Sequence, residues 1–167
     1  MLVLLAQQGD RDALNEILER VQAPLFRYIR GILCSDAAAA EDVLQETLLR
    51  IARKLRWLSD SRLFDAWTYR IASNEAYRAL KRRSRQPIYE PVDEELPAGD
   101  PAPISAIDLT GAVTALSPAS RAVLLLHYQE ERRLEEIAEI LSIPLGTVKS
   151  RLAYGLRRLR ERMGHEP

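Results

Sequence analysis

Residues 134–152 of the chain read Leu-Glu-Glu-Ile-Ala-Glu-Ile-Leu-Ser-Ile-Pro-Leu-Gly-Thr-Val-Lys-Ser-Arg-Leu, and this stretch predicts two helices joined by a short turn. Apolar side chains recur at three- and four-residue spacing on both sides of Ser142-Ile143-Pro144. A residue before proline is pushed out of the helical region, so the first helix should end there. Two helices joined by such a turn, the second one basic, are typical of a helix-turn-helix.

The second of these helices is expected to run from about residue 145 to 163. Its apolar stripe consists of Val148, Leu152, Leu156, Leu159 and Met163. At about 100° per residue, the side chains that point away from this stripe are Ser150, Ala153, Tyr154 and Arg157, with Lys149 and Arg151 on the flanks. Six basic residues and one acidic residue lie between positions 149 and 162, which suits the phosphates and base edges of a DNA major groove. A solvated basic face is the alternative, and the preceding helix and turn argue against it.

The same periodicity predicts further helices upstream, and no alternating strand pattern occurs. Apolar residues at helical spacing over residues 14–33, 43–58 and 63–80 predict one small helical lobe. Ser117-Pro118 is a capping residue followed by proline at the first helical position, and an apolar helix follows it. We therefore expect an all-α fold with two small helical domains, at residues 1–86 and 111–167.

The even balance of 24 basic and 24 acidic residues conceals three parts of different charge. The net charge is +4 over residues 1–86, −6 over residues 87–110 and +2 over residues 111–167. The middle part has no basic residue and holds five of the nine prolines, which predicts a flexible acidic linker. Neutrality of the whole chain therefore does not exclude a nucleic-acid partner.

Composition excludes several functional classes. A chain of 167 residues forms one domain or two small ones, and not a large enzyme. One cysteine, two histidines and seven glycines that form no phosphate-binding loop predict no metal, no cofactor and no catalytic residues. Cys34 is expected to be a small buried hydrophobe. The apolar run over residues 1–6 is too short for a signal peptide or a membrane span, which predicts a cytoplasmic protein without membrane insertion.

A second cluster of basic residues lies at the C-terminal end of the N-terminal domain. Arg78, Lys81, Arg82, Arg83 and Arg85 follow a helical segment that carries Trp67, Tyr69, Asn74 and Tyr77. Basic residues interleaved with aromatic ones suit single-stranded nucleic acid, because charge follows the backbone and flat groups hold exposed bases. Trp67 and Tyr69 equally suit a hydrophobic core, and cations at a helix C-terminus are favourable through the helix dipole. Composition alone leaves both interpretations open.

Four segments in order resemble one family. Residues 40–51 are similar to the second conserved region of bacterial RNA polymerase sigma factors, and residues 64–76 are similar to the segment after it. Residues 116–126 and 134–152 resemble the fourth region. Because only these two regions are present, joined by a short acidic linker, the chain resembles the extracytoplasmic function (ECF) subfamily of the sigma-70 family, which is not enzymatic.

The resemblance implies a protein that binds core RNA polymerase, through its largest and second-largest subunits, and directs promoter-specific initiation of transcription. In the family, one helix of the second region docks on a coiled coil of the largest subunit. The matching core-polymerase-binding residues share one helix face by their spacing, and they are Asp42, Gln45, Glu46 and Leu49. The family also implies an anti-sigma factor that is wedged between the two lobes.

The resemblance further implies two promoter DNA contacts. The loop before the third helix captures a base flipped out of the minus-10 strand, so that binding and strand opening are one event. The matching minus-10 residues are Ser59, Asp60, Ser61, Arg62 and Phe64, with Asn74, Arg78 and Lys81 on the adjoining helix. The fourth region reads the minus-35 element, and the matching residues are Thr147, Lys149, Ser150, Arg151, Tyr154 and Arg157.

The sequence also departs from the family pattern. Arg133 stands where a Ser or Thr cap is common, Ser142 stands where Gly is common, and Tyr154 and Leu156 stand where Arg is frequent. These departures bear on which promoter sequence is recognised more than on whether the protein binds DNA. Two alternatives are a sigma-like decoy that binds an anti-sigma factor without directing transcription, and a stand-alone helix-turn-helix repressor. The repressor leaves the face from Asp42 to Leu49 unexplained.

The linker permits a hypothesis of its own. A charge of −6 between two basic lobes could pass through a positively charged channel of the polymerase, or it could reduce binding of the free protein to DNA. The alternative is that the acids only keep the linker soluble.

Overall fold

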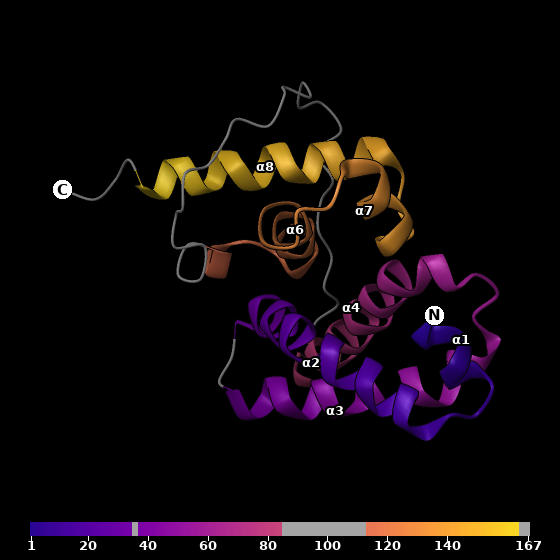
Figure 1. The fold of residues 1–167 in the computed structure, drawn as a ribbon. Coiled ribbons are helices and arrows are strands. Elements are labelled where there is room, and N and C mark those ends of the chain that lie inside the picture. Colours follow the sequence, from indigo (N-terminus) through magenta and orange to yellow (C-terminus); the bar gives the residue numbers. More distant parts are fainter. Residues whose placement is uncertain (35–36, 85–112, 164–167) are drawn as a thin grey trace.

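A computed structural model describes residues 1–34, 37–84 and 113–163 of the chain. These ranges are helical and contain no strand, which confirms the all-α prediction. Figure 1 shows two groups of helices, with α1 to α4 in one lobe and α6 to α8 in the other. The predicted linker at residues 87–110 lies outside the described residues.

The N-terminal lobe contains α1 (Leu2–Gln7), α2 (Arg11–Leu33), α3 (Ala37–Lys54) and α4 (Phe64–Arg83). Asp10 caps α2, because its carboxylate accepts a hydrogen bond of 3.0 Å from the backbone N–H of Ala13. The apolar faces of α2, α3 and α4 meet in a core whose fully buried members include Tyr28, Ile29 and Ile51. The core is therefore formed by the three stripes that the sequence predicts.

The C-terminal lobe contains η3 (Val113–Ala115), α6 (Pro118–Leu124), η4 (Leu125–Gln129), α7 (Leu134–Leu141) and α8 (Leu145–Met163). The Ser117 hydroxyl accepts a hydrogen bond of 3.2 Å from the backbone N–H of Ser120, which confirms the predicted cap. The turn after α7 holds Ser142 at φ 55°, in the left-handed region that favours glycine. A helix-turn-helix results, with bounds that match the sequence prediction.

The structure corrects three details of the sequence prediction. Helix α1 was not expected, and it packs on α2 and on the short helix η1 (Leu55–Trp57). The expected helix over residues 43–58 ends at Lys54, where the chain tightens into η1. Cys34 is exposed rather than buried, because it terminates α2 at φ 45° and so leaves the apolar stripe.

The two lobes share one hydrophobic core cluster, since α2 packs on α6 and η4, and α4 packs on α7. Gly31 permits this approach. A Cβ at position 31 would lie 2.6 Å from Cδ1 of Leu125, closer than side chains normally pack. Figure 1 shows α7 above α4, with α8 on the far side of the C-terminal lobe.

Candidate nucleic-acid interface

The outer face of α3 is polar and exposed. Its inner face buries Val43, Leu44 and Ile51 in the lobe core. Thr47 is also buried, and its hydroxyl donates a hydrogen bond of 2.8 Å to the carbonyl of Val43. The four predicted polymerase-binding residues are all exposed, and they are Asp42, Gln45, Glu46 and Leu49. Leu49 is an apolar side chain that is 47% exposed among acids and an amide, so this face combines negative charge with exposed apolar surface.

The loop between η1 and α4 is ordered by one aspartate. Asp60 accepts a hydrogen bond of 2.9 Å from the backbone N–H of Arg62, and the Arg62 guanidinium donates to both oxygens of the same carboxylate. These hydrogen bonds, from the side chain first and the backbone second, hold the pKa of Asp60 below its usual value. They also form the short helix η2 (Ser61–Leu63). The loop therefore has a defined shape before any ligand binds.

Phe64, the first residue of α4, is buried and not on the surface of the loop. Its side chain is 8% exposed, and its ring centroid lies 6.2 Å from that of Trp67. Ser59 and Arg62 are exposed, while Asp60 and Ser61 are half-buried. Four of the five predicted loop residues thus have at least partly exposed polar side chains, whereas Phe64 is buried.

Helix α4 presents its predicted minus-10 residues on one face. Asn74, Arg78 and Lys81 are all exposed. Sequence reasoning missed Glu75, a 5% exposed residue whose carboxylate lies 2.7 Å from Nη1 of Arg78 and 2.8 Å from Nε of Arg50. This buried acid orients Arg78 and ties α4 to α3. The sequence did contain a signal for this role, because Glu75 is a charged residue on an otherwise apolar face of the helix.

Helix α8 exposes the predicted reading residues to different degrees. Lys149 and Arg157 are exposed, whereas the other four are half-buried, and they are Thr147, Ser150, Arg151 and Tyr154. The guanidinium carbons of Arg157 and Arg158 lie 5.7 and 5.9 Å from the centroid of the Tyr154 ring. Leu156 is 6% exposed and belongs to the core. Leucine at this position, where the family often has Arg, therefore affects packing and not base contact.

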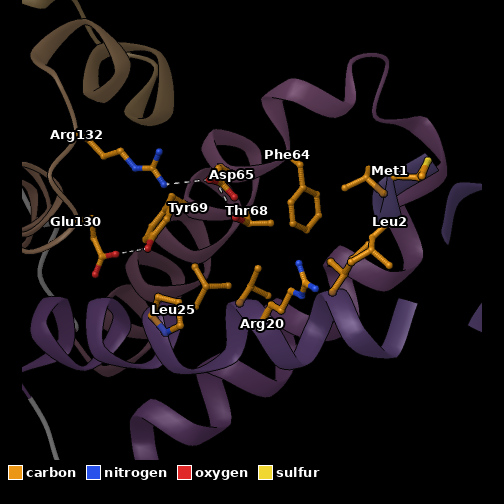
Figure 2. Close-up of a pocket in the computed structure, with 14 residues that line it drawn as sticks. Met1, Leu2, Arg20, Leu25, Phe64, Asp65, Thr68, Tyr69, Glu130 and Arg132 are labelled. Carbon is orange, nitrogen blue, oxygen red and sulfur yellow. Dashed lines mark hydrogen bonds and ion pairs between the residues drawn. The ribbon is translucent and has the colours of Figure 1, made fainter. Parts of the chain in front are cut away.

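The lobes are joined by polar contacts that the sequence did not predict. Figure 2 shows Tyr69 of α4 donating a hydrogen bond to Glu130, and Arg132 next to Asp65, with a nitrogen–oxygen distance of 3.5 Å. Arg70 of α4 donates hydrogen bonds to the backbone carbonyls of Glu139 and Ile140 at the end of α7, at 2.5 and 3.3 Å. These contacts join α4 to the C-terminal end of α7, where helix carbonyls point away from their own helix.

A cleft of about 670 Å³ opens beside these contacts. Its walls are residues of α1 and α2, apolar apart from Arg20, together with the first turns of α4, and Glu130 and Arg132 close one end (Figure 2). Within the described ranges no group of His, Cys, Asp and Glu side chains could hold a metal ion. None of the helices in those ranges is both long and apolar enough to cross a membrane.

Comparisons with known proteins identify this arrangement of helices. The profile of sigma-70 region 2 matches residues 17–86, and that of sigma-70 region 4 matches residues 112–161. The chain is 34% identical over 165 residues to the ECF RNA polymerase sigma factor SigL of Mycobacterium tuberculosis, with 93% of this chain and 91% of SigL covered. The chain belongs to the ECF sigma factors of the sigma-70 family.

Two further comparisons agree with this. The sigma factor is 32% identical to an RNA polymerase sigma-E factor of Streptomyces antibioticus, over 93% of this chain and 87% of that protein. Its fold matches that of the sigma factor RpoE of Bartonella quintana, solved in complex with the anti-sigma factor NepR, with a TM-score of 0.70 and 24% identity. That match covers 92% of this chain and 98% of RpoE. As a member of this family the protein is a non-enzymatic initiation factor of transcription.

Proposed function

We propose that the two lobes of this sigma factor have separate binding functions. The region 2 domain, residues 1–86, binds core RNA polymerase and opens the minus-10 element. The region 4 domain, residues 111–167, reads the minus-35 element, and residues 87–110 link the two. One observation carries this proposal: the exposed side chains of α3 between residues 41 and 49 are acidic, amide or apolar, whereas the exposed faces at the end of α4 and on α8 are basic. Surfaces of opposite charge suit a protein partner and DNA respectively.

The polymerase-binding face is Asp42, Gln45, Glu46 and Leu49 on α3. Charge reversal at Asp42→Lys and Glu46→Lys should weaken binding to core polymerase, because both carboxylates lie on a face that would meet a basic partner helix in the polymerase. Glu19→Lys reverses an exposed acid on α2 and is the matched control. Equal binding by all three variants would contradict the assignment.

The minus-10 site consists of the loop at residues 59–62, Phe64 and the exposed face of α4. Asp60 orders the loop, so a flipped base would meet a backbone that is already in place and the cost of extrusion would be partly repaid. We assign Asn74, Arg78 and Lys81 to the strand that leaves this loop. Single-stranded minus-10 DNA should therefore bind the Asp60→Ala variant more weakly than the wild type.

The minus-35 site is the outer face of α8, from Thr147 to Arg157. Lys149→Ala should lower affinity for minus-35 duplex DNA and reduce the salt slope of binding by about 0.9, the value for one lost phosphate contact. Arg11→Ala removes an exposed cation of the other lobe and should leave the slope unchanged. A slope that is unchanged in Lys149→Ala would remove Lys149 from the interface.

We propose that an anti-sigma factor occupies the cleft between the lobes. The cleft is lined by both lobes and combines apolar side chains with charged ones such as Arg20 and Asp65, which suits an amphipathic helix. A purified anti-sigma factor that represses this protein should fail to repress the Val21→Asp variant, whose new charge lies in the cleft wall. Transcription without the repressor should proceed in that variant.

Run-off transcription with purified core polymerase on a promoter library tests the function as a whole. Specific initiation from a subset of sequences is expected. Polymerase binding without specific initiation would instead indicate a decoy that only titrates an anti-sigma factor.

A further inference from the structure

An exposed tryptophan follows the end of α3. Trp57 in η1 is 63% exposed, and among the large hydrophobic side chains of the described residues only Met1 is more exposed. The preceding apolar residue in η1, Leu55, is 2% exposed and anchors the turn in the core. Burial of an aromatic ring would contribute a large favourable free energy, so packing of the lobe does not account for the outward position of the indole.

The backbone around Trp57 is held on both sides. The side-chain amide of Gln7 on α1 donates hydrogen bonds of 3.0 Å to the carbonyl of Leu55 and 2.7 Å to the carbonyl of Leu58. The backbone N–H of Leu58 also donates to the carbonyl of Leu55, at 3.1 Å. Helix α1 thereby fixes the turn from which the indole projects. An aromatic side chain on a fixed backbone loses little conformational entropy when it binds a ligand.

The surroundings of Trp57 are basic. Arg53, Lys54 and Arg56 are exposed, and in the part of the chain that the structure describes no acidic side chain pairs with any of them. The guanidinium carbon of Arg56 lies 4.0 Å from the Trp57 ring. The helix dipole favours cations at the end of α3, but it does not require an exposed indole beside them. A flat ring with one guanidinium against it and two further exposed cations nearby in the sequence suits single-stranded nucleic acid better than an apolar protein surface.

Trp57 also lies next to the proposed minus-10 loop. It precedes Ser59 by two residues, so their Cα atoms are at most about 7 Å apart. A strand whose base is held by this loop would therefore have a neighbouring nucleotide within reach of the indole. The acidic residues Asp42 and Glu46 lie in the first half and the middle of α3, further from Trp57 along the helix.

We propose that Trp57, with Arg56 against its ring, is a stacking platform for a base of the opened promoter strand, adjacent to the base held by the minus-10 loop. This inference rests on the proposed function of that loop. Stacking uses the flat face that every base has, so the platform stabilises the open strand without reading its sequence. Arg53, Lys54 and Arg56 supply the charge for its phosphates.

The test uses reconstituted holoenzyme and a promoter recovered from the library, with its minus-10 region opened in advance by mismatches. Trp57→Ala should weaken binding by about 5- to 150-fold, the range that base–aromatic stacking supplies. Trp57→Phe should retain most of the affinity because it keeps an aromatic face. Leu4→Ala is the matched control, since it removes a 51% exposed apolar side chain from α1.

An abasic scan of the opened strand separates stacking from a loss of structure. Removal of the one stacked base should reduce wild-type binding to the level of Trp57→Ala and should cost that variant nothing further. Replacement of that base by any other base should have little effect on the wild type. The proposal is overturned if Trp57→Ala binds the opened promoter as tightly as the wild type, or if every abasic position weakens the two proteins equally.

Two controls distinguish this inference from the proposed function. Affinity for core polymerase alone should be the same for Trp57→Ala and the wild type, and a loss there would make Trp57 a polymerase contact and overturn the platform. Failure of the wild type to initiate at any promoter would overturn the proposed function together with this inference. Normal wild-type initiation with an unaffected Trp57→Ala variant would overturn this inference alone.

Discussion

The Tyr69 hydroxyl on α4 donates a hydrogen bond to the carboxylate of Glu130, which lies beyond η4 in the other lobe. The Glu130 side chain is only 7% exposed, and it also accepts a hydrogen bond of 2.9 Å from the side-chain amide of Gln129. A nitrogen of the Arg27 guanidinium lies 4.0 Å from the same carboxylate. A buried acid of the C-terminal lobe therefore lies against two polar side chains of the N-terminal lobe, Tyr69 and Arg27.

Removal of either partner should weaken the contact between the lobes. Hydrogen bonds to charged groups contribute about 1.5–3 kcal/mol, so Tyr69→Phe and Glu130→Gln should each lower the free energy of unfolding. A double-mutant cycle measured by urea denaturation should give a coupling of about 1–2 kcal/mol. Strictly additive effects would show that the two side chains do not interact in solution.

Stability should fall at high pH because two tyrosines are buried in neutral form. Burial raises the pKa of Tyr28, and burial together with the Glu130 hydrogen bond raises the pKa of Tyr69. In the unfolded chain tyrosine ionises near pH 10, so the contribution of each group is complete below about pH 10 and is lost as pH rises from there toward the folded pKa. The unfolding free energy should decline above pH 10 by up to about 1.4 kcal/mol per pH unit for each group.

The Tyr28→Phe variant tests this prediction. Its hydroxyl lies 2.8 Å from that of Ser73, so the variant should be less stable at neutral pH by about 1 kcal/mol. Its stability should decline less steeply than that of the wild type above pH 10, whereas the two curves should run parallel between pH 7 and 9. Parallel curves at all pH values would mean that the Tyr28 pKa is not raised.

Glu75 should contribute more to stability than a surface carboxylate. Glu75→Gln removes the charge that Arg50 and Arg78 share, and both cations can then turn toward water, so we expect a loss of about 1–3 kcal/mol. Glu16→Gln breaks an exposed pair with Arg20 on α2 and should change stability by less than about 0.5 kcal/mol. Thermal unfolding of the two variants measures the difference, and equal shifts would contradict a structural role for Glu75.

Ser142→Gly should stabilise the helix-turn-helix. The left-handed conformation at φ 55° is unfavourable for serine and not for glycine, and the greater freedom of glycine in the unfolded chain offsets part of the gain. We expect a net gain of about 0.5–1 kcal/mol. Ala153→Gly, in the interior of α8, should lose about 1 kcal/mol in the same thermal melts. A loss in both variants would indicate that the Ser142 side chain has another role.

Helices and their faces were predictable because they depend on local spacing. The stripes at Ile17, Ile29 and Ile51, the cap at Ser117 and the break at Ser142 each follow from residues a few positions apart. Cys34 was misjudged because burial depends on where a helix ends, and that end has a left-handed residue that no spacing rule indicates. Helix α1 was missed because six residues contain too few turns to show a period.

By itself the sequence determined the helical class, the two regions, their order and the family, because each rests on local patterns and on motif matches. Only the tertiary structure decided how the lobes meet. Tyr69 with Glu130, Arg70 with the end of α7, and Gly31 with Leu125 are pairs more than sixty residues apart. It also decided that Phe64 is buried while Trp57 is exposed. Such contacts depend on shape and on the satisfaction of buried polar groups, which no periodicity in the chain encodes.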